Sequence, residues 1–112
     1  MAKKPESVFR ARFDPRLKEI PRSWFTSIQQ MALVGVPDKL GVVNGWFCGL
    51  ELKKDSKSKP TKIQAWVLSK IRAAGGYAAV VYPENADKVI SDLMELTKGK
   101  SPDQLQEGVV YE

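Results

Sequence analysis

The sequence predicts an α/β fold: a mixed sheet flanked by helices, with the elements in the order helix, three strands, helix, strand, helix. An Asn-Gly pair separates two β-prone runs, 38–43 and 45–52, and this dipeptide is a strong signal for a tight hairpin. Apolar side chains recur at helical spacing over 61–74. The run YAAVVY, 77–82, lacks alternation, which is typical of a strand covered on both faces. A hairpin followed by a crossover helix and a further strand gives a mixed sheet.

Proline positions and the spacing of apolar residues predict the elements before the hairpin. The stretch PESVFRARF, 5–13, indicates a short first helix with Pro5 in its first turn. Pro15 and Pro21 predict an irregular connection after it. The aromatic and β-prone stretch SWFTSIQQ, 23–30, then predicts the first strand.

The second half of the chain contains two amphipathic helices with clear stops. The helix over 61–74 is followed by a Gly-Gly pair, and another amphipathic pattern covers 84–99 and ends in glycine. We therefore expect a single domain over 1–112 with its core at about 5–98. The tail, 99–112, carries little signal.

Composition excludes several kinds of chemistry. The chain has no histidine, which removes Ser-His and Cys-His catalysis and His-ligated zinc. Its single cysteine, Cys48, cannot form an internal disulfide and is expected to pack as a small hydrophobe. The net charge of +5 and the pI of about 9.4 favour a polyanionic partner, although a basic soluble protein without one has the same composition. No stretch resembles a signal peptide or a membrane span, so we expect a cytoplasmic protein without a membrane partner.

Two carboxylates and an amine mark the open end of the predicted hairpin. Asp38 begins its first strand, while Glu51 and Lys53 end its second strand and face the same side. Asp38 and Glu51 are nearly equidistant from the turn, so they should approach each other across the ladder. Such carboxylates repel unless a cation or a shared proton lies between them, and Mg²⁺ needs only one or two carboxylates. The alternative is an Asp in a Pro-Asp turn and a solvated Glu-Lys pair.

An ordered set of motifs surrounds these three residues. It comprises GVPD at 35–38, GLELK at 49–53, Gln64 on the next helix and the Gly-Gly stop of that helix. In this set the chain resembles the PD-(D/E)XK nuclease superfamily, and within it the virus-type replication-repair nuclease (VRR-NUC) branch. The resemblance covers roughly residues 33–82. It implies a restriction-endonuclease-like core of order αβββαβ and DNA hydrolysis that depends on Mg²⁺, with Mn²⁺ as a substitute.

The resemblance also implies roles for individual residues. Asp38 and Glu51 would ligate the metal together with the backbone carbonyl of Leu52, and Lys53 would be the catalytic lysine of the motif. Glu6 matches the acidic residue that the superfamily has in its first helix. This match implies a catalytic role for Glu6 and, less securely, a role as a metal ligand. The alternative for Glu6 is an exposed glutamate favoured by the helix dipole.

Gln64 has two interpretations. It matches the glutamine that this branch places beside the catalytic site. It also stands three residues after Thr61, so the two could form a capping box at the start of the helix over 61–74 without any role at the site.

Basic side chains near the motif suggest how DNA would be held. The stretch KKDSKSKPTK, 53–62, is expected to be an exposed loop, whose lysines would reach backbone phosphates. Three arginines near the first helix would extend the same surface. The DNA-binding candidates are Lys54, Lys57, Lys59 and Lys62, with Arg10, Arg12 and Arg16. The alternative is a solvated loop whose lysines only aid solubility.

The resemblance implies a substrate class and an assembly. Family members are small homodimers, or modules of larger repair proteins, that cut structured DNA. A chain with the module alone suggests a stand-alone, phage-type enzyme in the cytoplasm of a bacterial host. We expect a homodimer that acts on branched DNA, with Holliday-junction resolution as its leading activity. The alternatives are a structure-insensitive, exonucleolytic or restriction-type nuclease on the same core, and a non-catalytic DNA-binding module.

The aromatic residues give a further expectation. Trp24, Trp46 and Trp66 each lie in an apolar pattern, so we expect them in the core rather than stacked on bases. The first helix and the positions Trp24 and Phe25 are candidates for a dimer surface, which the sequence does not otherwise indicate.

Overall fold

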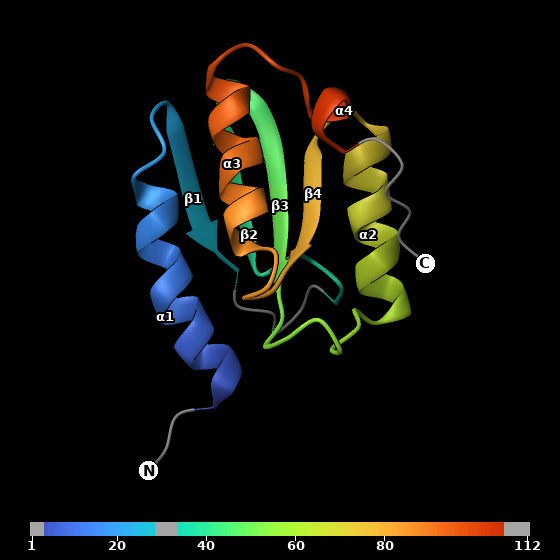
Figure 1. Cartoon of the computed structure of the whole chain (residues 1–112). Coiled ribbons are helices and arrows are strands. Elements are labelled where there is room, and N and C mark those ends of the chain that lie inside the picture. Colours follow the sequence, from blue (N-terminus) through green and yellow to red (C-terminus); the bar gives the residue numbers. More distant parts are fainter. Residues whose placement is uncertain (1–3, 29–33, 107–112) are drawn as a thin grey trace.

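Four strands form one mixed sheet with helices packed on both of its faces (Figure 1). The computed structural model describes residues 4–28 and 34–106. The elements are α1 (Pro5–Lys18), β1 (Ser23–Ser27), β2 (Lys39–Val43), β3 (Trp46–Leu52), α2 (Lys62–Ala73), β4 (Tyr77–Val81), α3 (Ala86–Thr97) and α4 (Pro102–Leu105). The predicted α/β class and the mixed sheet flanked by helices are confirmed.

The sheet has the order β1-β2-β3-β4, so β1 and β4 are its edges. β1, β2 and β3 pair antiparallel, whereas β4 pairs parallel with β3 because α2 connects them. The turn between β2 and β3 is the predicted hairpin turn: Asn44 and Gly45 have φ of 49° and 87°. Asn and Gly adopt this left-handed backbone most readily. The two-residue turn sets the register, in which Lys39 lies opposite Leu50.

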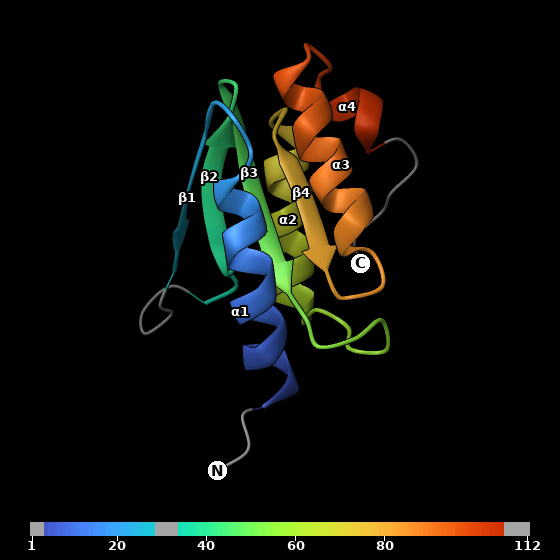
Figure 2. The same ribbon diagram turned by 60° about the vertical axis from the view of Figure 1, so that its left-hand side comes forward.

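The helices form two unequal layers. α1 and α3 lie on one face of the sheet and α2 on the other, as the two views show (Figures 1 and 2). The larger core lies between the sheet and α1 with α3, whereas α2 packs on β3 and β4. Cys48 is fully buried in the larger core, as predicted, and burial raises the pKa of its thiol to about 12. None of the described helices has the length and apolarity needed to cross a bilayer.

Helix α1 is longer than the sequence pattern predicted. The expected irregular connection at Pro15 is wrong, because α1 continues through this proline to Lys18. A proline inside a helix costs about 3 kcal/mol. Leu17 and Ile20 are buried in the core on the far side of Pro15, and each such side chain contributes about 1.5–3 kcal/mol. Tertiary packing therefore outweighs the local signal.

Two other boundaries differ from the predictions. β1 ends at Ser27, and the last two residues of the strand predicted over 23–30 lie outside the described residues. The segment after α3 carries little sequence signal, but it forms α4, which begins with a capping box between Ser101 and Gln104. Gln106 is buried, and its side chain forms hydrogen bonds with the backbone at the start of β4. It accepts from the N–H of Ala78 and donates to the carbonyl of Gly76.

The tryptophans do not lie in the core, so that prediction is wrong. The exposed fractions are 64% for Trp24, 58% for Trp66 and 36% for Trp46. Trp24 lies on β1, which α2 does not cover, and Trp66 lies on the side of α2 that faces away from the sheet. The tryptophans do stand among apolar residues in the sequence. Within the described residues, however, no other element packs over their side chains.

Candidate active site

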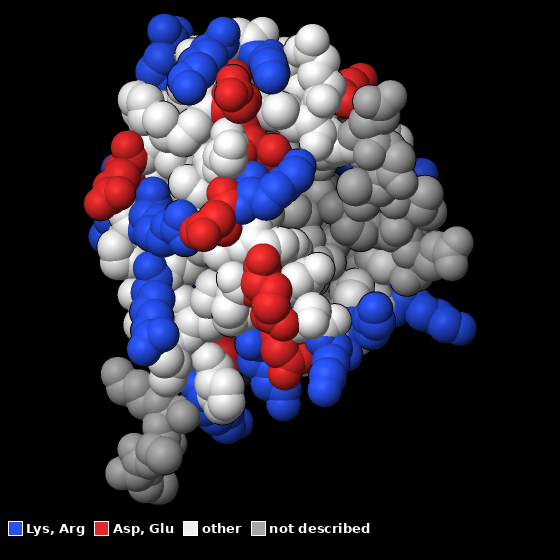
Figure 3. Space-filling model, in the orientation of Figure 1, with Lys and Arg blue, Asp and Glu red and all other residues white. Residues whose placement is uncertain are grey.

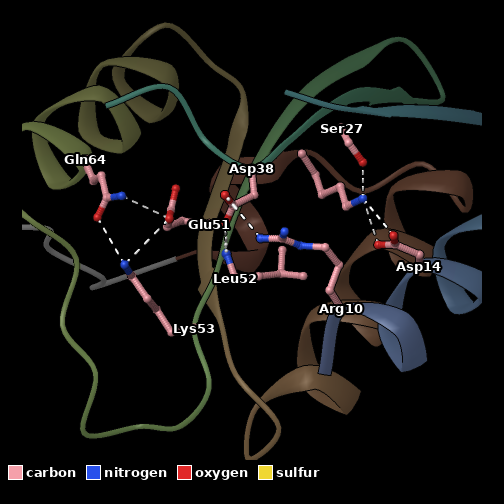
Figure 4. A network of polar contacts seen from close by, with 9 residues as sticks. Arg10, Asp14, Ser27, Asp38, Glu51, Leu52, Lys53 and Gln64 are labelled. Carbon is pink, nitrogen blue, oxygen red and sulfur yellow. Dashed lines mark hydrogen bonds and ion pairs between the residues drawn. The ribbon is translucent and has the colours of Figure 1, made fainter. Parts of the chain in front are cut away.

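The hairpin brings Asp38 and Glu51 together, as their spacing predicted. Lys39 lies opposite Leu50 in the ladder, so the next positions outward on the two strands are Asp38 and Glu51. Oδ2 of Asp38 accepts a hydrogen bond from the backbone N–H of Leu52 at 2.8 Å (Figure 4). The backbone at the end of β3 thus holds the Asp38 carboxylate beside Glu51.

Glu51 is a buried carboxylate with an unsatisfied oxygen. Only 3% of the residue is exposed. Its Oε2 accepts a hydrogen bond from Gln64 Nε2 at 3.1 Å and lies 3.7 Å from Lys53 Nζ. Its Oε1 is buried without a hydrogen-bond partner. Burial first, and then the charge of Asp38, raise the pKa of Glu51 to about 8, while the charge of Lys53 acts in the opposite direction.

Gln64 caps the helix and contacts the site at the same time. The predicted capping box is present: the Thr61 side chain accepts from the Gln64 N–H, and Gln64 Oε1 accepts from the Thr61 N–H at 2.8 Å. The same Oε1 accepts from Lys53 Nζ at 3.3 Å, and Nε2 reaches Glu51 (Figure 4). The two interpretations of Gln64 are therefore not exclusive, because one amide group makes both sets of contacts.

Arg10 lies inside the carboxylate site rather than only on a basic surface. Its Nη2 is 3.5 Å from Oδ1 of Asp38, and its Nε is buried without a hydrogen-bond partner. The side chain reaches the site from α1 (Figure 4). Its guanidinium partly neutralises the Asp38 carboxylate.

A second polar cluster lies behind the site, and the sequence reasoning missed it. Lys39 is only 4% exposed, and its Nζ contacts the Asp14 carboxylate at 2.9 Å and the hydroxyl of Ser27. Lys39 alternates with Leu40 and so faces the core side of the sheet, toward α1. The alternation of side chains along β2 is a signal that Lys39 faces inward. The counter-ion of Lys39 follows only from the position of α1, which carries Asp14.

The oxygen atoms at the site fit a divalent cation of the Mg²⁺ type. Mg²⁺ binds through one or two carboxylates and keeps several waters, so Asp38, Glu51 and the carbonyl of Leu52 suffice. The unpartnered Oε1 of Glu51 is a buried polar atom that such a cation would satisfy. Over the described ranges, no three His, Cys, Asp or Glu residues gather closely enough to hold a metal ion. Glu6 makes only a small electrostatic contribution to the raised pKa of Glu51.

The raised pKa predicts how the metal-free protein responds to pH. The folded-state pKa of Glu51, about 8, lies above its ordinary value of 4.5. The contribution of Glu51 to the free energy of unfolding is therefore largest below about pH 4.5. This contribution is lost as pH rises through about 8. In chelator, the free energy of unfolding should fall by roughly 3 kcal/mol more in the wild type than in Glu51→Gln between about pH 5 and pH 9. Urea denaturation at both pH values measures this difference, and parallel pH profiles would contradict it.

The basic loop after β3 is exposed and is held by hydrogen bonds within the loop and to Glu84. Oδ1 of Asp55 accepts from the N–H groups of Lys57 and Ser58, and Glu84 accepts from the N–H of Ser56. The four predicted lysines, Lys54, Lys57, Lys59 and Lys62, are all exposed. Lysine and arginine side chains lie along the lower edge of the face drawn in Figure 3.

Lys53 and Lys54 face different parts of the molecule. Lys53 points to Glu51 and Gln64, whereas Lys54 lines a cavity of about 520 Å³ together with Arg12 and Arg16. Arg16 also pairs with Asp87 at 2.9 Å. Of the basic residues predicted to share one surface, Lys54, Arg12 and Arg16 line this cavity together, whereas Arg10 lies at Asp38.

No protein-family model, curated protein or solved structure matches this chain. The interpretation of the site therefore rests on the geometry described above.

Proposed function

We propose that this protein is a Mg²⁺-dependent endonuclease of the PD-(D/E)XK type, close to the VRR-NUC branch, that hydrolyses phosphodiester bonds in branched DNA. The observation that carries the proposal is the pairing of Asp38 with the buried Glu51, whose Oε1 is unsatisfied and which has the amine of Lys53 beside it. The order αβββαβ of the first six elements agrees with a restriction-endonuclease-like core.

Each residue of the site would have a different role in hydrolysis. Asp38, Glu51 and the Leu52 carbonyl would hold Mg²⁺, which when bound supplies a water of lowered pKa and an electrophile for a phosphate oxygen. Lys53 Nζ stands beside the carboxylates, where its charge stabilises the negative charge that develops on the phosphate. Gln64 orients both Lys53 and Glu51 through hydrogen bonds from a capped helix end.

The surface around the site supports a substrate recognised through its backbone. The exposed lysines and the cavity lined by Lys54, Arg12 and Arg16 can contact phosphates without reading base edges. A four-way junction is resolved by two cuts in symmetry-related strands, and a two-fold homodimer provides two identical sites for them. We therefore propose junction resolution by a homodimer.

Two alternative functions use the same fold. A structure-insensitive or exonucleolytic enzyme would cut branched and linear DNA alike. A non-catalytic module would bind DNA without cutting it. Incubation with four-way junction, flap, splayed and linear DNA, with Mg²⁺ or with chelator, separates these functions. Faster cutting of the junction only with Mg²⁺ supports the proposal, and equal cutting of all substrates, or undiminished cutting in chelator, would refute it.

The loop lysines should govern affinity rather than rate. Lys57→Ala and Lys59→Ala should each weaken DNA binding and lower the slope of log K against log salt by about one unit, because each removes one phosphate contact. Fluorescence anisotropy over a range of salt concentrations measures the slope. Lys98→Ala, at the exposed C-terminal end of α3, is the matched control. Unchanged slopes in both loop variants would show that the loop only aids solubility.

A further inference from the structure

Among the described residues, three buried side-chain atoms have no hydrogen-bond partner, and all three belong to the polar network drawn in Figure 4. They are Nε of Arg10, Oδ1 of Asp14 and Oε1 of Glu51. Oδ1 of Asp14 is compensated by charge, because Lys39 Nζ lies 2.9 Å from it. Oε1 of Glu51 would be satisfied by a divalent cation. Nε of Arg10 is left as a buried donor that lacks an acceptor, which is rare in folded proteins.

The contact between Arg10 and Asp38 is loose. Nη2 of Arg10 lies 3.5 Å from Oδ1 of Asp38, whereas a charge-assisted hydrogen bond of this kind is about 2.7–2.9 Å long. Within the described residues, no second carboxylate pairs with Arg10. The Arg10 side chain is 40% exposed, so a ligand from solvent can reach it. The guanidinium can therefore exchange Asp38 for another anion at little cost.

Helix α1 itself is firmly attached beside this loose contact. Asp14 stands one helical turn after Arg10 and pairs with the buried Lys39, which directly follows Asp38 in the chain. Phe9, the residue before Arg10, is buried in the larger core. The backbone of α1 is thus fixed at this height. Only the guanidinium, at the end of a flexible side chain, is free to change its partner.

A phosphate group supplies the acceptor that the guanidinium lacks. Arginine binds phosphate through two parallel N–H···O bonds, so one phosphate can use Nε and a terminal nitrogen together. Asp38 links the guanidinium to the proposed metal ligands, because it interacts with Glu51 as well as with Arg10. A phosphate bound beside Asp38 and Glu51 would therefore lie within reach of Arg10.

We infer that Arg10 is a catalytic residue that exchanges partners: its guanidinium is the counter-ion of Asp38 without metal, and it binds the phosphate at the cleavage position when Asp38 ligates a divalent cation. This inference rests on the proposed function, which places a phosphodiester at these carboxylates. The motifs that carry the resemblance do not include this arginine. Because Arg10 and the cation compete for the charge of Asp38, metal binding and phosphate binding should reinforce each other through Arg10.

The competition can be measured without DNA. Arg10→Gln should bind Mn²⁺ about tenfold more tightly than the wild type, because no positive charge then opposes the metal at Asp38. Arg10→Lys keeps the charge and should bind Mn²⁺ like the wild type. Titration of each protein with Mn²⁺, followed by the electron paramagnetic resonance signal of the free ion, gives the affinity. Circular dichroism should show that all variants are folded.

Arg22→Gln is the matched control for Arg10→Gln. It makes the same chemical change at an exposed arginine. The carbonyl of Arg22 accepts from the N–H of Asn44 at the turn end of β2, so this residue lies at the opposite end of the strand from Asp38. Its affinity for Mn²⁺ should equal that of the wild type.

The exchange to phosphate can be measured without cleavage. Fluorescence anisotropy with four-way junction DNA, in Ca²⁺ or in chelator, gives the factor by which the cation tightens DNA binding. This factor should be at least about fivefold larger in the wild type than in Arg10→Gln, because only the wild type has a guanidinium to release. Arg22→Gln should have the factor of the wild type.

Cleavage adds the test of the catalytic role. At saturating protein and Mg²⁺, Arg10→Gln should lower the single-turnover rate by about 10²-fold, and Arg10→Lys should recover part of it. Tighter metal binding together with slower cleavage in one variant distinguishes this role from a structural one. A folding defect would weaken both properties.

The outcomes separate the parts of the inference. An affinity for Mn²⁺ that is unchanged or weaker in Arg10→Gln would overturn the role of Arg10 as counter-ion. Equal Ca²⁺ factors in the wild type and Arg10→Gln, or cleavage by this variant at the wild-type rate, would overturn its contact with the phosphate. A Ca²⁺ factor that depends on Arg10, in a protein that cuts none of the DNA substrates, would support the exchange and count against the nuclease proposal alone.

Discussion

Asp38→Asn and Glu51→Gln should each lower Mg²⁺-dependent cleavage of junction DNA by about 10³-fold or more, with DNA binding nearly unchanged. Each substitution removes one of two carboxylates at the site but keeps an acceptor oxygen and the side-chain shape. In Asp38→Asn the amide oxygen can still accept from the N–H of Leu52, so the end of β3 should stay in place. The loss reflects several kcal/mol of metal-dependent stabilisation of the transition state.

Single-turnover cleavage and a binding assay in Ca²⁺ or chelator separate the two effects. Asp103→Asn, which changes an exposed carboxylate on α4 in the same way, is the control and should cut like the wild type. Cleavage at the wild-type rate by either site variant would place the metal elsewhere. Loss of binding together with cleavage would indicate a folding defect and would be visible by circular dichroism.

Lys53→Ala should lower the single-turnover rate by about 10²-fold or more, whereas Lys54→Ala should change it only a few-fold. Lys53 Nζ lies 3.7 Å from Glu51 and 3.3 Å from Gln64, so its charge stands beside the carboxylates that we propose to hold the metal. Lys54 lies on the cavity wall with Arg12 and Arg16, where it can contribute to affinity only. The pair is a matched comparison, because it removes the same charge from two adjacent residues.

Rates measured at saturating protein distinguish chemistry from binding in this comparison. Lys53→Arg adds a second test: it keeps the charge, so partial recovery relative to Lys53→Ala would show that electrostatic stabilisation is the main role. Equal losses of rate at positions 53 and 54 would contradict the different surroundings of the two side chains.

Local rules were enough to predict the centre of the candidate site. The conformational preference of Asn44 and Gly45 sets a two-residue turn, and a two-residue turn sets the register of its strands. Once the register is set, the distance of Asp38 and Glu51 from the turn makes them neighbours. The two-residue period of a strand then puts Lys53 on the same side as Glu51. The capping box of Gln64 follows from spacing within one helix turn in the same way.

Contacts between distant segments were not predictable from these rules. Arg10 was assigned to a DNA surface, but the path that α1 takes, packed on β1, brings it to Asp38. The same path gives Lys39 its counter-ion, Asp14, which lies 25 residues earlier in the chain. Periodicity shows which side of an element is apolar and does not show which other element packs there.

The sequence by itself thus determined the order of the elements from α1 to α3, the β2–β3 turn and the carboxylates that this turn brings together, because each depends on residues close in the chain. Only the tertiary structure decided which apolar side chains are covered. Trp24 and Trp66 have the patterns of core residues, yet both are more than half exposed. Trp24 is exposed because α2 packs on β3 and β4 and leaves β1 and β2 open on that face, whereas Trp66 lies on the side of α2 that faces away from the sheet. Coverage of a sheet face depends on where every helix packs, and no local pattern contains that information.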